Sequence, residues 1–211
     1  MWIASGLAEL LWPQRCAACD ALSGLEWALC RPCHDTLLRA EAAEQRLSFP
    51  RPPAWTRARC QFEFGGQLAL AIRRAKYGGD SALARLLGRL LRPLPPDYDL
   101  AIPVPLHPRR LRARGFNQAA ELLRGAGIRP RIELLVRTRD TPPQTDRPLP
   151  ARLRNVAGAF AVHMPERVKG RRVLLVDDVM TTGATADACA RALSEAGSAA
   201  VLVLALARAP L

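Results

Sequence analysis

The sequence of 211 residues is 49% hydrophobic, which suits one domain of ordinary size with a smaller attachment. Its net charge of +12 favours polyanionic partners such as nucleic acid or phosphates, although a bias of composition toward arginine would give the same excess. No stretch approaches the roughly eighteen apolar residues of a membrane span, and the apolar start lacks the basic residues of a signal peptide.

Four of the six cysteines lie near the N-terminus as two CxxC pairs, Cys16 with Cys19 and Cys30 with Cys33. We expect a cytoplasmic protein, where thiols stay reduced, so this pattern indicates a metal site. Each CxxC turn directs both sulfurs to one ion, and four thiolates complete a closed, structural Zn²⁺ site. A segment this short needs the metal to fold. Its tryptophans either fill the small core or stack on bases; they are Trp12 and Trp27.

Three regions follow from composition: a zinc-ribbon domain over residues 1–47, a Pro- and Arg-rich linker over 48–59, and an α/β domain over 60–211. Apolar runs predict strands at 60–66, 99–105, 131–138, 158–163, 171–179 and 198–208. Helical spacing predicts helices at 68–76, 81–91, 114–127, 149–156 and 183–197. Strands that alternate with helices favour a parallel sheet with helices on both faces. In this interpretation Cys60 and Cys189 are small buried hydrophobes.

The stretch VLLVDDVMTTGAT, residues 173–185, ends a buried strand with two acids and continues through a small polar turn into a helix. Ligands bind beyond the carboxyl ends of parallel strands, and the first N–H groups of a helix attract phosphate. Gly183 allows close approach of the backbone, and the threonine hydroxyls add donors. Asp177 and Asp178 would repel the phosphate, so they suit ribose hydroxyls and hydrated Mg²⁺. The stretch predicts a ribose-5-phosphate site; the alternative is a capped helix without a ligand.

This stretch resembles the phosphoribosylpyrophosphate (PRPP) motif of type I phosphoribosyltransferases. Nearly the whole chain resembles the ComF family, through the four cysteines and the segments IRRAKYGGD, IPVPLHPRRLRARGFNQAAELL and RTRDTPPQTDRPLPARLRNVAGAFAV. The resemblance implies a phosphoribosyltransferase-like fold behind a zinc ribbon and a link to DNA uptake during natural competence. It leaves the acceptor substrate open.

On this resemblance, Asp177 and Asp178 are the catalytic candidates and meet the ribose hydroxyls, with Mg²⁺ nearby. The residues implied to hold the 5′-phosphate are Thr181, Thr182, Gly183, Ala184 and Thr185. Hypoxanthine-guanine members of the superfamily have an acid in the place of Thr181. The threonine argues against a purine-salvage enzyme of that type.

The loop after the strand at 99–105 is rich in cations: His107, Arg109, Arg110, Arg112 and Arg114. Pyrophosphate leaving a ribosyl carbon needs cations and N–H groups to meet the developing charge. The corresponding loop of phosphoribosyltransferases holds pyrophosphate, so Arg109 and Arg110, whose forks suit phosphate oxygens, are the candidates. The alternative is a solvated basic loop. No acid partner for His107 is visible in the sequence, and we assign it no role.

Two further segments admit two interpretations each. The polar loop at 139–148 is either a lid that brings Arg139, Gln144 and Arg147 to PRPP, as superfamily members do, or a mobile surface loop. Lys76 and Tyr77 either contribute to a hood over the acceptor or simply end a helix.

Two functions of different class remain. One is an enzyme that transfers phosphoribosyl from PRPP to an acceptor. The other is a protein that handles single-stranded DNA and keeps the PRPP site as a sensor. Residues 104–172 contain 16 basic and 5 acidic residues. This excess of 11 positive charges suits the phosphate backbone of a nucleic acid. Only Phe116 and Phe160 accompany these charges, which does not support base-specific recognition.

Overall fold

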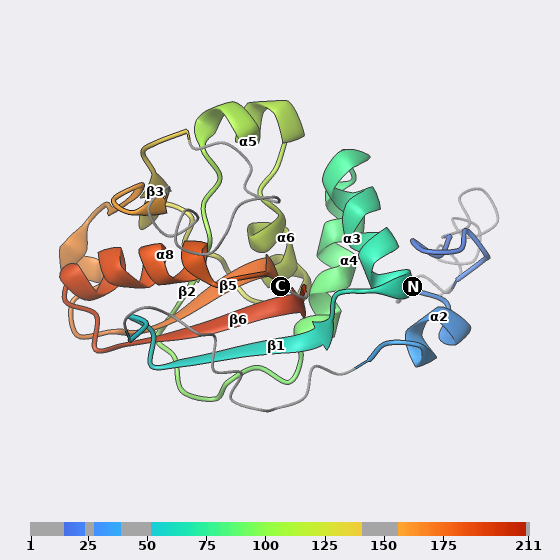
Figure 1. Ribbon diagram of the computed structural model, residues 1–211, viewed down its shortest axis with the longest axis horizontal. Coiled ribbons are helices and arrows are strands. Elements are labelled where there is room, and N and C mark those ends of the chain that lie inside the picture. The colour runs from blue at the N-terminus through green and yellow to red at the C-terminus, as the bar shows by residue number, and fades with distance from the viewer. Residues whose placement is uncertain (1–14, 24–27, 39–51, 141–155, 210–211) are drawn as a thin grey trace, which may run out of the picture.

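The computed structural model describes residues 15–23, 28–38, 52–140 and 156–209 (Figure 1). Its centre is a four-stranded sheet in the order β1-β6-β5-β2, and every neighbouring pair is parallel. The strands are β1 (Arg57–Glu63), β2 (Leu100–Pro103), β5 (Arg172–Met180) and β6 (Ala200–Arg208). The predicted α/β class with a parallel sheet is therefore confirmed.

Successive side chains of each strand point to opposite faces of the sheet, and both faces are apolar. In β5, Leu174 and Val176 lie on the face covered by helices α3 and α6, whereas Val173 and Leu175 lie on the face covered by α8. All four side chains are fully buried. The helices of the first face are α3 (Gly66–Tyr77), α4 (Ser81–Leu87) with the 3₁₀ turn η1 (Gly88–Leu91), and α6 (Gln118–Gly125). The second face carries α8 (Ala184–Glu195). Helices thus cover both faces, as predicted.

Helices α4 and α6 pack closely because glycines meet at their contact. A Cβ atom at Gly88 would overlap the carbonyl of Leu122, and one at Gly125 would overlap the carbonyl of Arg85. Nearby, Glu121 is buried on α6 between Arg85 at 2.9 Å and Arg124. Helix α6 thus packs directly on α4, and its first residue, Gln118, lines the pocket beside Asp178.

Two predicted strands lie outside the main sheet. β3 (Leu135–Arg137) and β4 (Phe160–Val162) pair with each other in an antiparallel two-stranded sheet. Only the first residue of each is buried, so neither is apolar on both faces as a central parallel strand must be. Phe160 and Leu135 pack on the same side of the main sheet as α8. The prediction that these segments extend the parallel sheet was wrong.

β1 begins earlier than predicted, inside the residues assigned to the linker. Arg57 pairs with Leu202 of β6, and the pairing continues to Glu63 with Arg208. The arginines at 57 and 59 hid this start because they interrupt the apolar run. Apart from this strand, the boundaries of the zinc-ribbon domain, the linker and the α/β domain stay a prediction.

The N-terminal module packs against the first helix of the larger domain. It contains an isolated bridge between Arg15 and Leu22 and the short helix α2 (Arg31–Asp35). Ala17 and Leu29 belong to the same buried cluster as Ile72 of α3. The amide of Glu63 also donates to the carbonyl of Leu38 at 2.9 Å.

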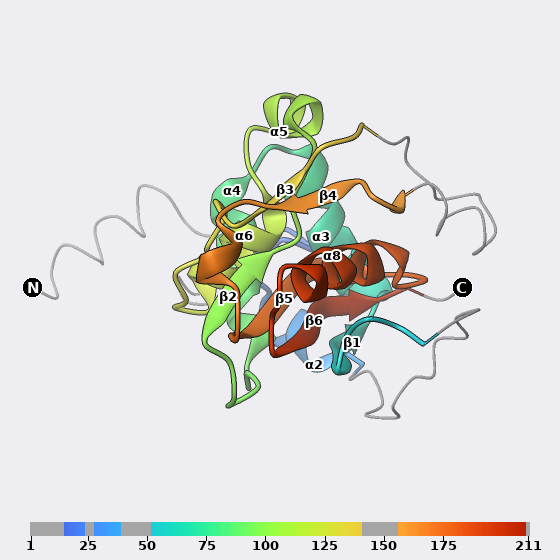
Figure 2. The same cartoon turned by 90° about the vertical axis from the view of Figure 1, so that its left-hand side faces the viewer.

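Some predicted features lie outside the described residues: Trp12, Trp27, Gln144, Arg147 and nearly all of the helix expected at 149–156. Within the described ranges, none of the helices combines the length and apolar character needed to cross a membrane. Figure 2 shows the strands of the sheet side by side, with helix α5 standing apart from them.

Candidate phosphoribosyl site and cysteine cluster

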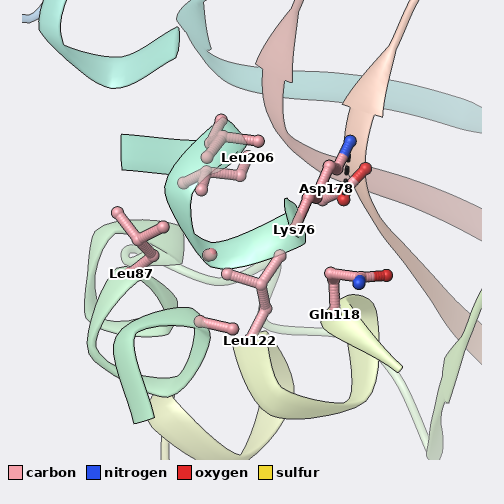
Figure 3. A pocket seen from close by; sticks show the side chains of 9 residues that line it. Lys76, Leu87, Gln118, Leu122, Asp178 and Leu206 are labelled. Carbon is pink, nitrogen blue, oxygen red and sulfur yellow. Dashed lines mark ion pairs between the residues drawn. The ribbon is translucent and has the colours of Figure 1, made fainter. Parts of the chain in front are cut away.

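The two adjacent acids lie near the end of β5, and Asp178 has a cation beside it. The ammonium Nζ of Lys76, in the last turn of α3, is 2.9 Å from Asp178 Oδ2 (Figure 3). The two side chains are only 19% and 15% exposed. They border an otherwise largely apolar pocket whose lining includes Leu87, Leu122 and Leu206. Lys76 therefore provides the countercharge for Asp178 from a distant part of the sequence.

Asp177 is half-buried, and its surroundings disfavour its charge. Burial, followed by the neighbouring charge of Asp178, raises the pKa of Asp177 to about 7, although the charge of Lys76 acts in the opposite direction. Its Oδ1 accepts a hydrogen bond from the amide of Asp178 at 2.9 Å. The pKa of Cys60 is raised to about 12, chiefly by burial, and the charge of Asp177 contributes to this rise. Asp177 thus faces the α8 side of the sheet, and Asp178 the α3 side.

The turn after β5 leads directly into α8. Gly183 is the residue before the helix and has a left-handed backbone with φ of 76°. Thr182 is buried, and its hydroxyl accepts from the amide of Ala184 at 3.4 Å. A side chain at position 183 would be strained in this conformation, which explains the glycine. The sequence-predicted turn residues Thr181, Thr182, Gly183, Ala184 and Thr185 therefore surround the N-terminus of a twelve-residue helix.

The predicted basic loop after β2 is instead a short helix, α5 (Pro108–Arg114). His107 caps it, since its Nδ1 accepts from the amide of Arg109 at 3.3 Å, and Gly115 ends it with φ of 83°. None of its residues is buried. The helix escaped prediction because PRRLRAR has no apolar face, although Pro at the start and Gly at the end were usable signals.

Asp140 lies opposite the start of α5. Its Oδ1 is 3.6 Å from Nδ1 of His107, and its Oδ2 is 3.5 Å from a guanidinium nitrogen of Arg109. This neighbouring acid was not visible in the sequence, because 32 residues separate His107 and Asp140 and only tertiary folding brings them together. Arg110 is half-buried on the same helix, and Arg139 donates to the carbonyl of Ala157.

An exposed aromatic residue accompanies the basic helix. The guanidinium of Arg114 lies 5.8 Å from the ring centre of Tyr77, whose residue is 79% exposed. In the sequence, only Phe116 and Phe160 accompany the basic segment. The contact of Tyr77 with this segment was not predictable, because Tyr77 comes from α3, far along the chain from α5.

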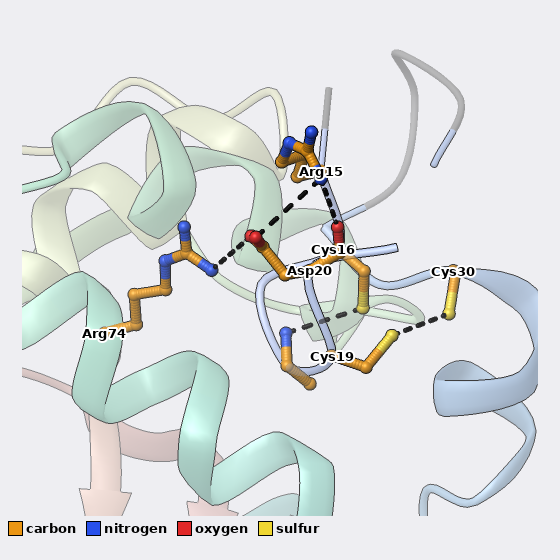
Figure 4. Close-up of polar contacts among 7 residues, drawn as sticks. Arg15, Cys16, Cys19, Asp20, Cys30 and Arg74 are labelled. Atoms are coloured by element: carbon orange, nitrogen blue, oxygen red, sulfur yellow. Dashed lines mark hydrogen bonds and ion pairs between the residues drawn. The ribbon is translucent and has the colours of Figure 1, made fainter. Parts of the chain in front are cut away.

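Four thiols gather in the N-terminal module. The Sγ atoms of Cys16, Cys19, Cys30 and Cys33 all lie within 4.8 Å of one another, and those of Cys19 and Cys30 are 3.6 Å apart (Figure 4). The amide of Ala18 donates to Cys16 Sγ at 3.4 Å. Burial would raise the pKa of Cys16, yet hydrogen bonds from nearby backbone and thiol groups lower it to about 6. Burial raises the pKa of Cys33. Four sulfurs this close suit one metal ion, which would offset the repulsion among thiolates.

Known proteins resemble this chain in sequence. The phosphoribosyl transferase domain family matches residues 115–210. The DNA utilization protein YhgH of Escherichia coli O157:H7 is 32% identical over 209 residues, covering 92% of this chain and 89% of that protein. Competence protein F of Haemophilus influenzae is 32% identical over 171 residues, covering 74% of this chain and 75% of that protein. Among solved structures, glutamine PRPP amidotransferase from B. subtilis aligns with a TM-score of 0.39 at 23% identity, covering 59% of this chain and 26% of that one.

Proposed function

Because the chain belongs to the ComF family of phosphoribosyltransferase-domain proteins, we propose that it binds PRPP at the turn between β5 and α8. The observation that carries the proposal is the left-handed Gly183 at the start of α8, shortly after a parallel strand that has two adjacent acids near its end. The first N–H groups of a helix have no partner within the helix, and its dipole favours an anion. The 5′-phosphate would bind there, with Thr181, Thr182, Ala184 and Thr185 around it.

Asp177 and Asp178 would receive the ribose hydroxyls, together with Mg²⁺. Carboxylate oxygens are the acceptors that hydroxyl groups and hydrated Mg²⁺ prefer. The raised pKa of Asp177 means that part of this site bears a proton at neutral pH before the ligand arrives. A cation bound with PRPP would favour the ionised acids.

The pyrophosphate of PRPP would lie on the α5 side of the site, near Arg109 and Arg110. Arginine binds phosphate oxygens in a bidentate manner, which supports this placement. Departure of pyrophosphate would leave positive charge on the ribose ring, so transfer requires an acceptor nucleophile nearby. Whether the protein uses such an acceptor decides between a transferase and a PRPP sensor.

The cysteine cluster would hold one structural Zn²⁺. Four thiolates and no open ligand position are typical of structural zinc sites. His34, next to Cys33, lies 3.6 Å from Asp35 through its Nδ1, so it is engaged beside the cluster rather than in it. The ion would stabilise the module that packs against α3.

Binding of single-stranded DNA is a second candidate function, and the stacked pair of Tyr77 and Arg114 favours it. Aromatic rings and arginines beside a positive surface are typical of proteins that bind single strands with little sequence preference. Relatives are named for DNA utilization and competence, which agrees with this candidate. Affinity would fall steeply as salt rises, because binding releases counterions. An affinity that stays constant between low and high salt would contradict it.

One experiment tests both candidates. The protein is incubated with PRPP and Mg²⁺, with and without single-stranded DNA, while pyrophosphate release and DNA retention are followed. The Gly183→Val variant should lose PRPP binding, since the new side chain is strained and crowds the phosphate position. Arg114→Gln should weaken DNA retention and keep PRPP binding. Unchanged PRPP binding by Gly183→Val would refute the proposed phosphate site.

A further inference from the structure

The ion pair between Lys76 and Asp178 joins a helix to the central sheet beside the candidate site. Its partners come from α3 and β5 (Figure 3), and both side chains are largely shielded from water. By contrast, the pair between Arg74 and Asp20 also involves α3, but its side chains are 51% and 57% exposed. Shielding strengthens the attraction between charges and also makes an unpaired partner costly. The lysine is therefore coupled to the acid more strongly than a surface cation would be.

We propose that Lys76 is a positioning residue that holds the carboxylate of Asp178 in a fixed orientation for the ribose of PRPP. This inference rests on the proposed PRPP site. Lys76 contacts Oδ2 of Asp178 at 2.9 Å, and a carboxylate accepts several hydrogen bonds, so the acid keeps capacity for a ribose hydroxyl. The lysine also places a positive charge beside two adjacent acids that would otherwise repel each other.

Helix α3 directs the side chain of Lys76 toward the sheet. Ile72 and Ala75 are buried on the same side of the helix and line the pocket beside Asp178. Tyr77, the next residue, is 79% exposed and lies on the solvent side. The helix ends at Gly78, whose amide donates to the carbonyl of Arg74 at 2.8 Å. A cation in this last turn is also favoured by the helix dipole.

Two roles for the lysine must be distinguished. A lysine that merely raises the positive potential would attract the phosphates of PRPP without acting on Asp178. A lysine that positions Asp178 must be energetically coupled to it. A double-mutant cycle separates the two, because only contacting or linked residues give non-additive effects.

The test uses Lys76→Met, Asp178→Asn and the double variant in the full-length protein. The only other lysine, Lys169, is exposed, so Lys169→Met removes the same charge elsewhere and serves as the matched control. PRPP affinity is measured by calorimetry with Mg²⁺. The free energies of unfolding of the ligand-free parent, single variants and double variant give the double-mutant cycle. We expect Lys76→Met to weaken PRPP binding by about tenfold, within the range of coupling between contacting residues. Lys169→Met should bind like the parent, and the cycle should be clearly non-additive.

Three results would overturn the proposal. The first is unchanged affinity in Lys76→Met, and the second is an equal loss in Lys169→Met. The third is a loss of affinity in Lys76→Met together with additive unfolding energies, which would show that the lysine acts through its charge alone. A parent that does not bind PRPP would refute the proposed function itself. A coupled unfolding cycle in that case would assign Lys76 a structural role only.

Discussion

The N-terminal module and the sheet domain differ in what holds them together. In the described part of the module, two of the five buried apolar residues are cysteines of the cluster, Cys16 and Cys33, and the others are Ala17, Ala28 and Leu29. The sheet domain instead buries whole rows of branched side chains, including Leu174, Leu175 and Leu204 on its central strands. A small segment without a core depends on a ligated metal, whereas the sheet depends on apolar burial. Each region should therefore unfold in response to a different change: the module on loss of the metal, and the sheet domain on loss of apolar contacts.

Removing the metal should have the largest effect, and it should be local. Structural zinc contributes about 10–16 kcal/mol in zinc-finger peptides, so chelation or Cys16→Ser should unfold the module. Hydrogen exchange should show loss of protection in residues 15–23 and 28–38 while the amides of β5 and β6 stay protected. Metal analysis should give one zinc per chain before chelation. A Cys16→Ser protein that keeps stoichiometric zinc and its fold would contradict the account of the module.

Truncating the core of the sheet should have the next largest effect. Leu174 is fully buried on β5, between β2 and β6, and Leu174→Ala should destabilise the protein by about 2–5 kcal/mol. The loss follows from the missing apolar contacts and the cavity left behind. Chemical unfolding measures it, and zinc content should not change. A loss of zinc in this variant would show that the two regions fold as one unit.

Asp177→Asn should stabilise the sheet domain, with a dependence on pH. The pKa of Asp177 is raised from its ordinary value of 3.8 to about 7, so ionisation destabilises the folded state. This penalty is absent below pH 4, grows as pH rises, and is complete above pH 7. The variant should melt about 2–8 °C higher than the parent at pH 8 and equally at pH 4. Equal melting temperatures at pH 8 would mean that the acid is well accommodated in the fold.

Breaking the contact between the regions should have the smallest effect. Arg74 and Asp20 join α3 to the module at 3.1 Å, but both are about half exposed. Arg74→Gln should therefore change the free energy of unfolding by less than about 1 kcal/mol. Zinc content and PRPP binding should stay as in the parent. If the variant released zinc, the ion pair rather than the buried contacts would anchor the module.

The sequence revealed those parts of the fold that local patterns encode. The apolar runs of β5 and β6 and the helical spacing of α8 are signals within one segment, and the structure has these elements close to the predicted bounds. Helix α5 carries no apolar face and was missed, and β3 and β4 were recognised as strands but assigned to the wrong sheet. Their pairing depends on which segments meet in space rather than on either sequence alone.

The same distinction applies to the candidate site. The acids and the turn from Thr181 to Thr185 form one contiguous motif, and their grouping at the start of α8 was predictable. The partners that come from elsewhere were not: Lys76 beside Asp178, and Asp140 beside His107. The rarity of lysine in an arginine-rich chain was the one available signal for Lys76, and it does not identify a partner.

The central claim, that the turn between β5 and α8 binds PRPP, is tested most directly by ligand-induced thermal stabilisation. At a hundredfold excess over its dissociation constant, PRPP with Mg²⁺ should stabilise the parent by about 2.7 kcal/mol, which raises its melting temperature. The variant with both Asp177→Asn and Asp178→Asn keeps the shape of the site and loses its charge, so it should remain folded and show no such rise. The comparison uses the rise on adding PRPP, since Asp177→Asn alone changes the ligand-free melting temperature. The same rise in the double variant as in the parent, or no rise in the parent, would contradict the claim.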